Sequence, residues 1–431
     1  MICDNISVNG EGHLTFAGYD TVSLAQEFHT PLYLIDESKI REKCRIFCGA
    51  MKKAFSEDAV PLYAGKALCF KRMYEIMREE GMGADVVSSG ELYTALRGGM
   101  PPELLFFHGN NKTDDDIRYG ISKKVGYFVC DNTDELLALQ TEAERQGTVQ
   151  KVLLRITPGV DPHTHKAINT GRVDSKFGAA IETGQADELT RLALSLPSLA
   201  LCGFHCHIGS QIFDEKPFCL AAELMTAFIV HIRNAYGYAP KELNLGGGMG
   251  VRYLDSHPQI DYAENILKIG ELLHRRFAEN GIPFPRILME PGRSIVADAG
   301  MTLYTVGGRK EIPGFRNYVS VDGGMADNPR YALYQAPYTV YTANRMREKA
   351  DYVCTVAGRC CESGDLIQEN VPIAKPSRGD ILAVLTTGAY NYAMASNYNR
   401  LPRPPIVMLN KSGAHIAVKR ETLDDLIRND C

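Results

Sequence analysis

The sequence predicts an α/β fold: a (β/α)8 TIM barrel together with a second, mostly antiparallel β domain. Two observations predict the barrel. Eight short apolar runs occur before residue 290, as expected for parallel strands that are buried on both faces. Segments with apolar residues at three- and four-residue spacing, typical of amphipathic helices, separate most of these runs. A third observation predicts the second domain, because helical periods become rare after about residue 293 and turns rich in Gly, Pro and Asn replace them.

The expected barrel strands are short and rich in Val, Ile, Leu, Phe and Tyr. They are Leu62–Ala64, Ala84–Val87, Leu104–His108, Tyr127–Cys130, Val152–Ile156, Leu201–His207, Glu242–Leu245 and Ile287–Met289. Alternating strands and helices indicate parallel βαβ units, and a closed barrel typically needs about 250 residues. A doubly wound open sheet is the alternative that the same alternation allows.

The helices expected between these strands follow from the apolar spacing and from their end signals. They are Lys71–Glu80, Gly90–Arg97, Thr133–Gln146, Ala186–Leu194, Lys216–Tyr236 and Tyr262–Asn280. Gly81 follows the first of them, which is a typical signal for the carboxyl end of a helix. Asn132 and the acids that follow it are typical of a helix start.

We therefore expect residues 36–295 to form the barrel and residues 296–431 to form most of the β domain. Residues 1–35 also look β-like, and we expect them to complete the β domain, which would make the barrel an insertion. The expected strands and the one late helix of this domain are His13–Phe16, Met301–Gly307, Tyr318–Asp322, Tyr352–Ala357, Ile381–Thr386, Ile406–Leu409 and Thr422–Arg428.

Bulk composition argues against several classes of protein. The chain has 431 residues, 45% hydrophobic and 23% charged, and a net charge of -5, which does not favour nucleic-acid binding. No apolar run reaches the roughly 18 or more residues of a membrane span, and no signal peptide is visible. The 12 scattered cysteines suit reduced thiols in a cytoplasm. We expect no metal, since Cys206 and His207 would point to opposite faces of a strand.

Two charged residues stand just past the first and eighth predicted strands. Lys66 follows Leu62–Ala64, beside apolar neighbours, where partial desolvation would favour the neutral amine and formation of a Schiff base. Glu290 follows Ile287–Met289, where a carboxylate could keep a pyridine nitrogen protonated. A surface lysine and a salt bridge between Glu290 and Arg293 are the alternatives for these two positions.

Other strand ends carry residues that suit a phosphorylated, planar cofactor. The triplet Gly246–Gly248 follows the seventh strand, where barrels often bind phosphate through backbone N–H groups. His207 and Ser210 follow the sixth strand, where the imidazole could stack on a ring and the hydroxyl could donate to phosphate. Asp85, at the second strand end, could support the lysine. A core histidine and flexible turns explain these residues equally well in isolation. Together, an amine, a carboxylate, an imidazole and glycines at one barrel mouth indicate a pyridoxal-phosphate site.

Cys361 is the candidate proton donor in the β domain. It lies in the segment Cys360–Asp365, where acids flank two adjacent cysteines. Neighbouring cysteines rarely meet the geometry of a disulfide, and a thiol among acids is expected to keep its proton. A buried, inert cysteine is the alternative.

These pieces in this order resemble the diaminopimelate decarboxylase family, which belongs to the alanine-racemase-fold (fold type III) group of pyridoxal-phosphate decarboxylases. The resemblance covers nearly the whole chain. It is carried by Tyr63–Ala67, Asp85–Leu92, Lys176–Gly178, His207–Gln211, Gly246–Gly248, Glu290–Arg293, Cys361–Asp365 and Gly388–Tyr390. Each motif alone is modest, but the complete ordered set is specific.

The resemblance implies a role for each matched residue. Lys66 would carry pyridoxal 5'-phosphate, His207 would stack on its ring, and Glu290 would pair with the pyridine nitrogen. The implied cofactor contacts are Lys66, Asp85, His207, Ser210, Gly246, Gly247, Gly248, Glu290, Gly292, Arg293 and Tyr390. The implied substrate contacts are Arg293, Arg330, Tyr334, Glu362 and Tyr390. Cys361 would be the proton donor and, with Glu362, would reach the barrel of a partner subunit, which implies a homodimer.

The implied reaction is decarboxylation of meso-2,6-diaminopimelate to L-lysine and CO2, the last step of lysine biosynthesis. The alternatives are a related decarboxylase of ornithine, arginine or carboxynorspermidine, a racemase on the same fold, and a non-catalytic relative. The pair Arg330 and Tyr334, with Ser363 and Gly364 after Cys361–Glu362, favours a substrate with a distal carboxylate.

Overall fold

The structure is a computed structural model that describes residues 2–161 and 174–431. Its internal contacts divide the chain into two compact units. The barrel unit comprises Lys43–Gly250 and Ile260–Gly292, and the β unit comprises Met1–Glu42, Val251–Gln259 and Arg293–Cys431. Both units therefore consist of segments that are distant in the sequence.

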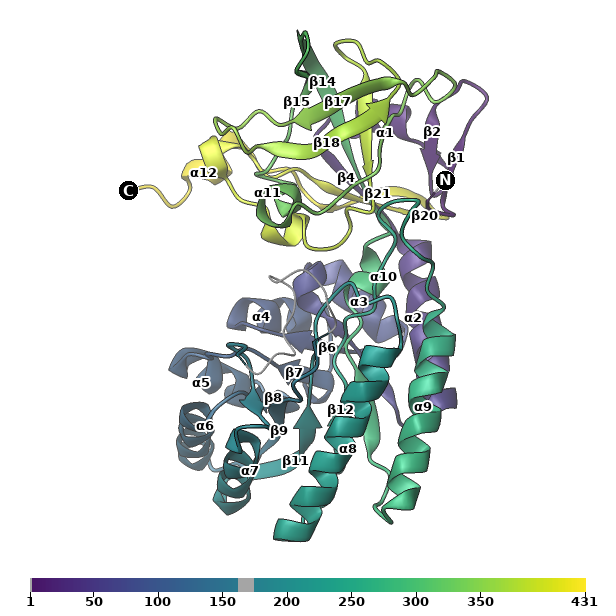
Figure 1. The fold of residues 1–431 in the computed structure, drawn as a ribbon. Helices are drawn as coiled ribbons and strands as arrows, with labels where there is room; N and C mark the ends of the chain where they lie inside the picture. Colours follow the sequence, from purple (N-terminus) through teal and green to yellow (C-terminus); the bar gives the residue numbers. More distant parts are fainter. Residues whose placement is uncertain (1, 162–173) are drawn as a thin grey trace. The chain divides into compact units, whose positions relative to one another are not determined.

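The barrel unit contains a closed ring of eight parallel strands (Figure 1). The ring runs β5 (Val60–Ala64), β6 (Gly83–Val86), β7 (Leu105–Phe107), β8 (Tyr127–Cys130), β9 (Gln150–Thr157), β11 (Leu199–His205), β12 (Glu242–Asn244) and β13 (Arg286–Met289). β13 pairs with β5, which closes the ring, and the short β10 (Ala179–Ala180) adds to β9. All eight predicted strands are confirmed, with ends that differ by a few residues, and the open-sheet alternative is wrong.

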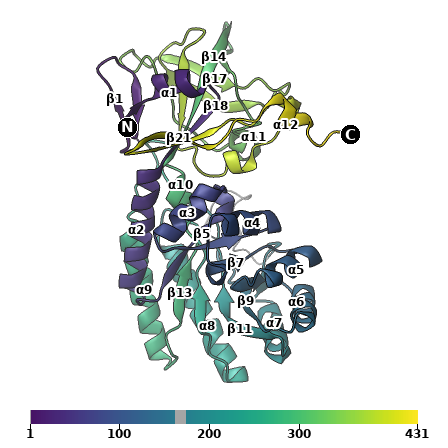
Figure 2. The ribbon, with the colours of Figure 1, turned by 180° about the vertical axis from the view of Figure 1, so that it is seen from behind.

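Helices connect the strands around this ring, as the reverse view also shows (Figure 2). They are α3 (Lys71–Glu79), α4 (Ser89–Arg97), α5 (Asp114–Ser122), α6 (Thr133–Arg145), α7 (Gln185–Ser195), α8 (Lys216–Tyr236) and α9 (Tyr262–Glu279), and α2 (Glu37–Ala54) precedes β5. The short 3-10 turns η1 (Gly65–Ala67) and η2 (Pro102–Leu104) complete the connections. The six predicted helices are confirmed, whereas α5 was not predicted.

The barrel is filled by side chains rather than hollow. One fully apolar cluster joins residues from six of the ring strands, namely Leu62, Phe106, Tyr127, Val129, Leu153, Cys202 and Leu288. In parallel strands the register places successive carboxyl ends at one mouth; for example, Leu62 pairs with Gly83 and Ala84 pairs with Leu105. Residues that follow these strands are therefore gathered at that mouth.

One barrel helix has the length and apolar composition of a membrane span. α8 reaches a mean hydropathy of 1.3 over its most apolar window, and 44% of that window is buried within the structure. Its buried positions include Phe218, Ala222, Met225, Ile229 and Ile232, whose spacing of three or four residues gives one apolar face. α8 contacts α9 and α7, so this composition is explained by an ordinary core helix.

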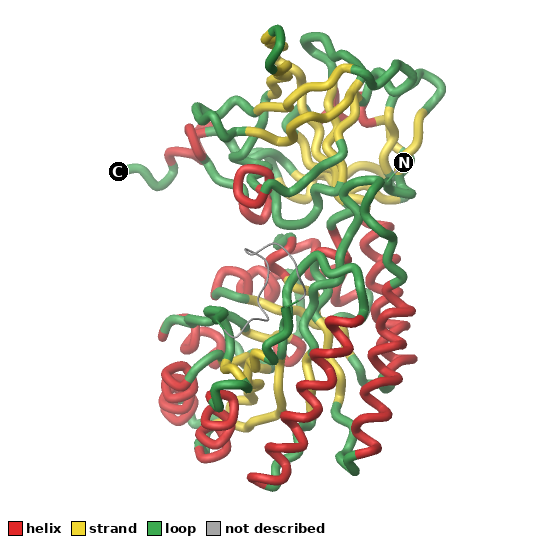
Figure 3. Tube along the Cα trace, in the orientation of Figure 1, coloured by secondary structure: helices red, strands yellow, loops and turns green. Residues whose placement is uncertain are grey.

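The β unit is dominated by one nine-stranded sheet with mainly antiparallel neighbours. Figure 3 draws its strands in yellow. Its strands are β4 (Leu32–Asp36), β14 (Gly300–Ile312), β15 (Arg316–Val321), β16 (Val340–Thr342), β17 (Tyr352–Ala357), β18 (Leu366–Ile373), β19 (Ile381–Leu385), β20 (Ile406–Asn410) and β21 (Gly413–Val418). Only the β15–β17 and β20–β4 pairs are parallel. The predicted mostly antiparallel domain is thus confirmed.

The β unit also contains several smaller elements. They are β1 (Ile6–Val8), β2 (Leu14–Phe16), β3 (Tyr19–Asp20), α1 (Thr21–Phe28), α10 (Arg293–Val296), α11 (Arg330–Tyr334), η4 (Tyr392–Met394), η5 (Tyr398–Arg400) and α12 (Leu423–Ile427). β4 pairs with both β14 and β20, so the N-terminal segment is built into the sheet of the later domain. Leu14, Phe16, Leu32 and Leu303 share its core.

Candidate active site

The two residues expected to act on one cofactor follow neighbouring strands of the barrel. Lys66 lies in η1, directly after β5, and Glu290 follows β13, which is hydrogen-bonded to β5. The backbone N–H of Ala64 also donates to the carbonyl oxygen of Pro291 at 3.2 Å, which ties the two strand ends together. The amine and the carboxylate therefore rise from adjacent positions at one mouth.

Glu290 is held by hydrogen bonds to the neighbouring strand β12 and to the loop that follows β12. The side-chain amide of Asn244 donates to Glu290 Oε1 at 2.7 Å, and the backbone N–H of Glu290 donates to Gly246 O at 2.8 Å. Asn244 in turn accepts from the backbone N–H of Gly246 at 2.9 Å. A carboxylate that is anchored in this way presents one oxygen in a constant orientation.

Two buried histidines surround the same carboxylate oxygen. Nε2 of His205, the last residue of β11, lies 3.0 Å from Glu290 Oε1, and Nε2 of His108, just after β7, lies 3.2 Å from it. Burial alone would raise the pKa of Glu290, but its electrostatic and hydrogen-bonding interactions with His205 and His108 outweigh burial and hold the pKa well below its ordinary value. Glu290 is therefore an anion throughout the neutral range.

The two histidines respond differently to this carboxylate. Burial would lower the pKa of His108, but Glu290 and Asp85 outweigh it and raise the pKa to about 9. For His205 burial prevails and lowers the pKa to about 4. Burial, aided by the charge of Glu290, raises the pKa of Asp85 to about 7. At neutral pH the cluster is thus a cationic His108, a neutral His205 and an anionic Glu290.

The polar atoms of this cluster are close together but poorly aligned. His108 Nε2 lies 3.3 Å from Asp85 Oδ1, an ion-pair distance, yet neither of these atoms has a hydrogen bond of acceptable angle among the described residues. The same holds for both ring nitrogens of His205. Buried polar atoms without aligned partners are costly, and they are expected where a ligand completes the site. His108, His205 and Glu290 are also spaced closely enough to hold a metal ion, so their spacing alone does not define the ligand.

The glycine triplet forms a backbone surface that other residues could not form. A Cβ atom on Gly247 would overlap the carbonyl oxygen of Glu290, and one on Gly248 would overlap that of Gly209. Gly246 and Gly248 have φ angles of 68° and 122°, which favour glycine. The triplet therefore packs directly against the backbone that follows β13 and β11, and only glycine fits these positions.

Lys66 differs from its sequence-based expectation in one respect. It is exposed, although Gly65 and Ala67 on either side are buried, so the expected partial desolvation is wrong for this structure. Lys66 is the central residue of the short 3-10 turn η1, whose buried residues are Gly65 and Ala67. An exposed amine remains accessible to an aldehyde.

His207 and Arg155, a cation that the sequence did not reveal, lie in the same unit. Burial holds the pKa of His207 well below its ordinary value, and the positive charges of Lys66 and Arg155 add to this effect. The ring is therefore neutral and suited to stacking on a planar group. Arg155, in β9, is 8% exposed, and its guanidinium lies 4.3 Å from the ring centroid of Phe177. Ser210 follows the same strand as His207 and is half-buried.

The remaining site candidates lie in the β unit. Arg293 begins α10, Arg330 begins α11, and both are 6% exposed. The Arg293 guanidinium lies 4.7 Å from the ring centroid of Tyr390, a non-glycine residue with a φ of 61°. Such backbone strain, which costs about 1–3 kcal/mol, clusters at binding sites. Tyr334 is half-buried at the end of α11.

The predicted proton donor and its neighbour are both exposed. The Cys361 backbone N–H donates to the side-chain oxygen of Asn399 at 2.8 Å, and the Tyr398 hydroxyl donates to Glu362 Oε1 at 2.7 Å. Cys360 is buried, and burial raises the pKa of its thiol to about 11, so it is an inert neighbour.

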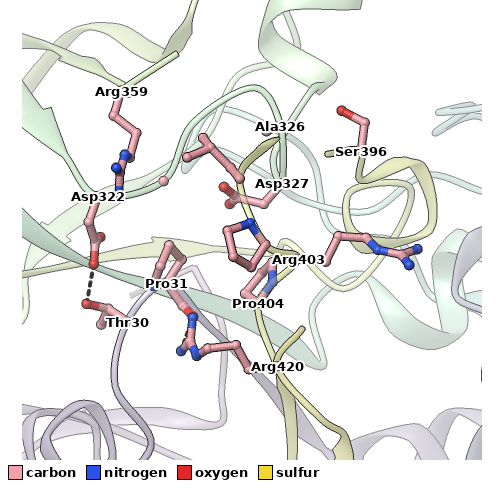
Figure 4. A pocket seen from close by; sticks show the side chains of 13 residues that line it. Thr30, Pro31, Asp322, Ala326, Asp327, Arg359, Ser396, Arg403, Pro404 and Arg420 are labelled. Atoms are coloured by element: carbon pink, nitrogen blue, oxygen red, sulfur yellow. Dashed lines mark hydrogen bonds between the residues drawn. The ribbon is translucent and has the colours of Figure 1, made fainter. Parts of the chain in front are cut away.

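A separate cavity of about 170 Å³ opens in the β unit (Figure 4). Three arginines line it, but two already have partners: Arg420 donates to the carbonyl oxygens of Phe28, His29 and Pro31, and Arg403 donates to Glu421. None of the catalytic candidates lines this cavity.

Several site residues were missed from the sequence alone. His108, Asn244, Arg155 and His205 were not singled out as cofactor-site residues. His108 ends the third predicted strand, and Asn244 and His205 end β12 and β11 in the structure, so their positions near strand ends were an available signal. What the sequence does not reveal is which of two adjacent strand-end residues points inward.

Comparisons with known proteins agree with this geometry. Residues 37–297 match the family model described as the pyridoxal-binding domain of pyridoxal-dependent decarboxylases. The chain is 46% identical to a diaminopimelate decarboxylase of Bacillus subtilis, over 98% of this chain and 96% of that protein. A diaminopimelate decarboxylase of Halalkalibacterium halodurans is also 46% identical, over the same shares.

Solved structures lead to the same class. The crystal structure of diaminopimelate decarboxylase from M. jannaschii, in complex with L-lysine, has a TM-score of 0.93 and 33% identity, and covers 100% of this chain and 98% of that chain. The fold and site define a pyridoxal-phosphate enzyme of the alanine-racemase-like architecture. The chain belongs to the family of pyridoxal-dependent decarboxylases, and two relatives that are 46% identical to it are diaminopimelate decarboxylases.

The barrel mouth fits the cofactor of this family. Glu290 is an anchored anion suited to a pyridinium N–H, the glycine triplet offers backbone where a Cβ would collide, and misaligned buried polar atoms surround both. The family match thus favours a pyridoxal ring over a metal ion beside His108, His205 and Glu290.

Proposed function

We propose that this protein decarboxylates meso-2,6-diaminopimelate and releases L-lysine and CO2. The observation that carries the proposal is the placement of Lys66 and an anionic, anchored Glu290 at the ends of two hydrogen-bonded strands. Similarity to diaminopimelate decarboxylases over nearly the whole chain, one of them solved with L-lysine, supports this substrate.

The cofactor would be held mainly by residues that directly follow strands of the barrel. Lys66 would hold the cofactor through its side-chain amine, and the Glu290 carboxylate would keep the pyridine nitrogen protonated. The neutral His207 ring would stack on the cofactor, and Asp85 would be a further contact. The phosphate contacts would be Ser210, Gly246, Gly247, Gly248, Gly292, Arg293 and Tyr390. When bound, pyridoxal phosphate supplies a cationic ring that accepts the electron pair left at Cα when CO2 departs.

The substrate would be recognised through its two charged ends. Arg293, Arg330, Tyr334 and Tyr390 would bind carboxylate, and Glu362 would bind the distal ammonium. A site with buried charged partners rejects an analogue that lacks the matching group, because its own groups are then left unpaired. This discriminates against ornithine, which has no distal carboxylate. The Cys361 thiol would donate the proton that replaces CO2 at Cα.

The position of Cys361 and Glu362 supports a homodimer with shared active sites. Both residues are exposed on the β unit, as groups that enter a partner subunit must be before assembly. The protein would act on a free amino acid in the cytoplasm, without nucleic acid or membrane as partner.

Product analysis tests this proposal. Purified protein loaded with pyridoxal phosphate should release one CO2 and one L-lysine per meso-diaminopimelate consumed, and Lys66→Ala should release neither. Ornithine, arginine and carboxynorspermidine at equal concentration should react much more slowly. Faster CO2 release from ornithine would support the related decarboxylase instead, and a product that retains both carboxylates would indicate a racemase. A protein that forms no visible absorption band with the cofactor would indicate a non-catalytic relative.

A further inference from the structure

Two buried guanidinium groups in the β unit share a phenol that has no assigned role. Tyr253, in the segment Val251–Gln259, is 1% exposed, and Arg293 and Arg330 are each 6% exposed. Buried charges are costly unless they are paired and hydrogen-bonded. The partners of these cations therefore indicate how the site tolerates them.

The contacts place both cations on the same aromatic ring. Arg293 Nη1 donates to the Tyr253 hydroxyl at 2.8 Å. The Arg330 guanidinium carbon lies 4.9 Å from the centroid of the Tyr253 ring, and its Nη1 donates to the hydroxyl of Tyr338 at 2.8 Å. The Tyr253 and Tyr338 rings meet edge to face, with centroids 5.6 Å apart. Tyr253 is thus contacted by one cation at its oxygen and by another over its ring.

The Tyr253 hydroxyl accepts but does not donate. Within residues 2–161 and 174–431, no group accepts its proton in a hydrogen bond, and no carboxylate forms an ion pair with Arg330. Tyr338, in contrast, has the Asn391 side chain beside its hydroxyl, with Nδ2 at 2.9 Å and Oδ1 at 3.2 Å. The proton of Tyr253 therefore faces positive charge on two sides, whereas that of Tyr338 has a neutral amide oxygen in reach.

These environments shift the two phenols in opposite directions. Burial would raise the pKa of Tyr253, but the charges of Arg293 and Arg330 outweigh it and lower the pKa. For Tyr338 burial prevails over Arg330, and the pKa is raised. Among the described residues, Arg293, Arg330 and Tyr338 contact the Tyr253 side chain, and His257 Nδ1 accepts from the Tyr253 backbone N–H at 3.2 Å. The Tyr390 ring lies against Arg293.

We propose that Tyr253 is a positioning residue whose phenol oxygen holds Arg293 and Arg330 together for recognition of a carboxylate. The inference rests on the proposed function, in which these arginines bind the acidic groups of substrate or cofactor. In the unliganded protein Arg293 donates to the phenol oxygen and Arg330 lies over the phenol ring, so both cations lower the pKa of Tyr253. A bound carboxylate neutralises part of this positive charge in exchange, so ligand binding raises the pKa of the phenol.

This exchange makes proton binding and ligand binding interdependent. If deprotonation of Tyr253 weakens carboxylate binding, then carboxylate binding must raise the pKa of Tyr253 by the corresponding factor. A residue that only fills space would not show this linkage. The proposal can therefore be tested without measuring turnover.

The test is an NMR titration of protein labelled with carbon-13 at tyrosine Cζ. In the cofactor-free protein, one of the 21 tyrosines should titrate below the ordinary value of about 10. That resonance should be lost in Tyr253→Phe and retained in the matched control Tyr331→Phe, whose phenol donates to Glu369 and has a pKa raised to about 12. In the cofactor-loaded protein, saturating L-lysine should move the midpoint upward, and Tyr253→Phe should weaken L-lysine binding about tenfold.

Two results would overturn the proposal. A low-titrating tyrosine that persists in Tyr253→Phe would assign the signal to another residue. A Tyr253 resonance that L-lysine does not move, with L-lysine binding unchanged in Tyr253→Phe, would show that the phenol does not serve carboxylate recognition. Either result would leave the release of CO2 from meso-diaminopimelate untouched, so failure of this proposal is distinguishable from failure of the proposed function.

Discussion

Replacing Glu290 with glutamine removes one negative charge from the cluster without changing its shape, and His108 should report the loss. His108 Nε2 lies 3.2 Å from Glu290 Oε1, and the two side chains are 8% and 10% exposed. At an effective dielectric constant of about 20, unit charges at this distance interact by about 5 kcal/mol, equal to nearly 4 pKa units. Loss of Glu290 also makes Asp85 easier to ionise, and an ionised Asp85 restores part of the stabilisation of the His108 cation. We therefore expect Glu290→Gln to lower the pKa of His108 from about 9 by about 2 units.

Histidine NMR of the cofactor-free protein measures this shift, with Glu264→Gln on the surface of α9 as the control. The raised pKa also has a consequence for folding. His108 contributes stability that is fully present below its ordinary pKa of about 6.5 and is lost as the pH rises through about 9, and Glu290→Gln should reduce that contribution. With cofactor, the variant should keep the covalent bond to Lys66 but lose at least about a hundredfold in turnover, because the ring nitrogen is no longer held protonated. A His108 pKa that stays near 9 in the variant would refute the electrostatic reasoning.

Three further substitutions probe other parts of the structure. Gly247→Ala should destabilise the protein by about 3 kcal/mol in chemical denaturation and weaken cofactor binding, because the new Cβ overlaps a backbone carbonyl oxygen. The control is Gly10→Ala, whose added Cβ has no atom within 4 Å. Equal stabilities of the two variants would contradict the expected overlap. Cys361→Ala should slow turnover about a hundredfold while cofactor affinity stays unchanged, and parallel losses of both would indicate a structural cysteine. Lys112→Met should cost about 3–5 kcal/mol in unfolding free energy, since it leaves the buried carboxylate of Glu135 without its cation; a loss below about 1 kcal/mol would be inconsistent with that buried pair.

Much of the barrel was predictable because its physics is local. Strands buried on both faces need continuous apolar runs, and runs such as Tyr127–Cys130 were located to the residue. The helix α5 escaped prediction because three acids occupy its first turn and only Ile117, Gly120 and Ile121 are buried. β18 was missed because three consecutive polar residues, Gln368, Glu369 and Asn370, interrupt its apolar pattern, and its strand character depends on pairing with β17.

Some site residues were likewise predictable from local sequence, whereas others depend on contacts between distant segments. Lys66, Glu290 and the glycine triplet could be proposed from the sequence because each directly follows a strand. The geometry around Glu290 could not, because whether His108 and His205 point at a carboxylate depends on register and on closure of the ring between β13 and β5. Tyr253 was equally hidden, as it reaches Arg293 and Arg330 only through contacts between segments far apart in the chain.

The central claim is that the amine of Lys66 and the carboxylate of Glu290 serve one pyridoxal ring at the barrel mouth. Reduction of the cofactor-loaded protein with borohydride, followed by peptide mass mapping, tests it directly. The pyridoxyl group should be found on Lys66 with a stoichiometry close to one per chain, and Lys66→Ala should carry none. A modification located on a different lysine, or a protein that retains no reducible cofactor, would contradict the claim.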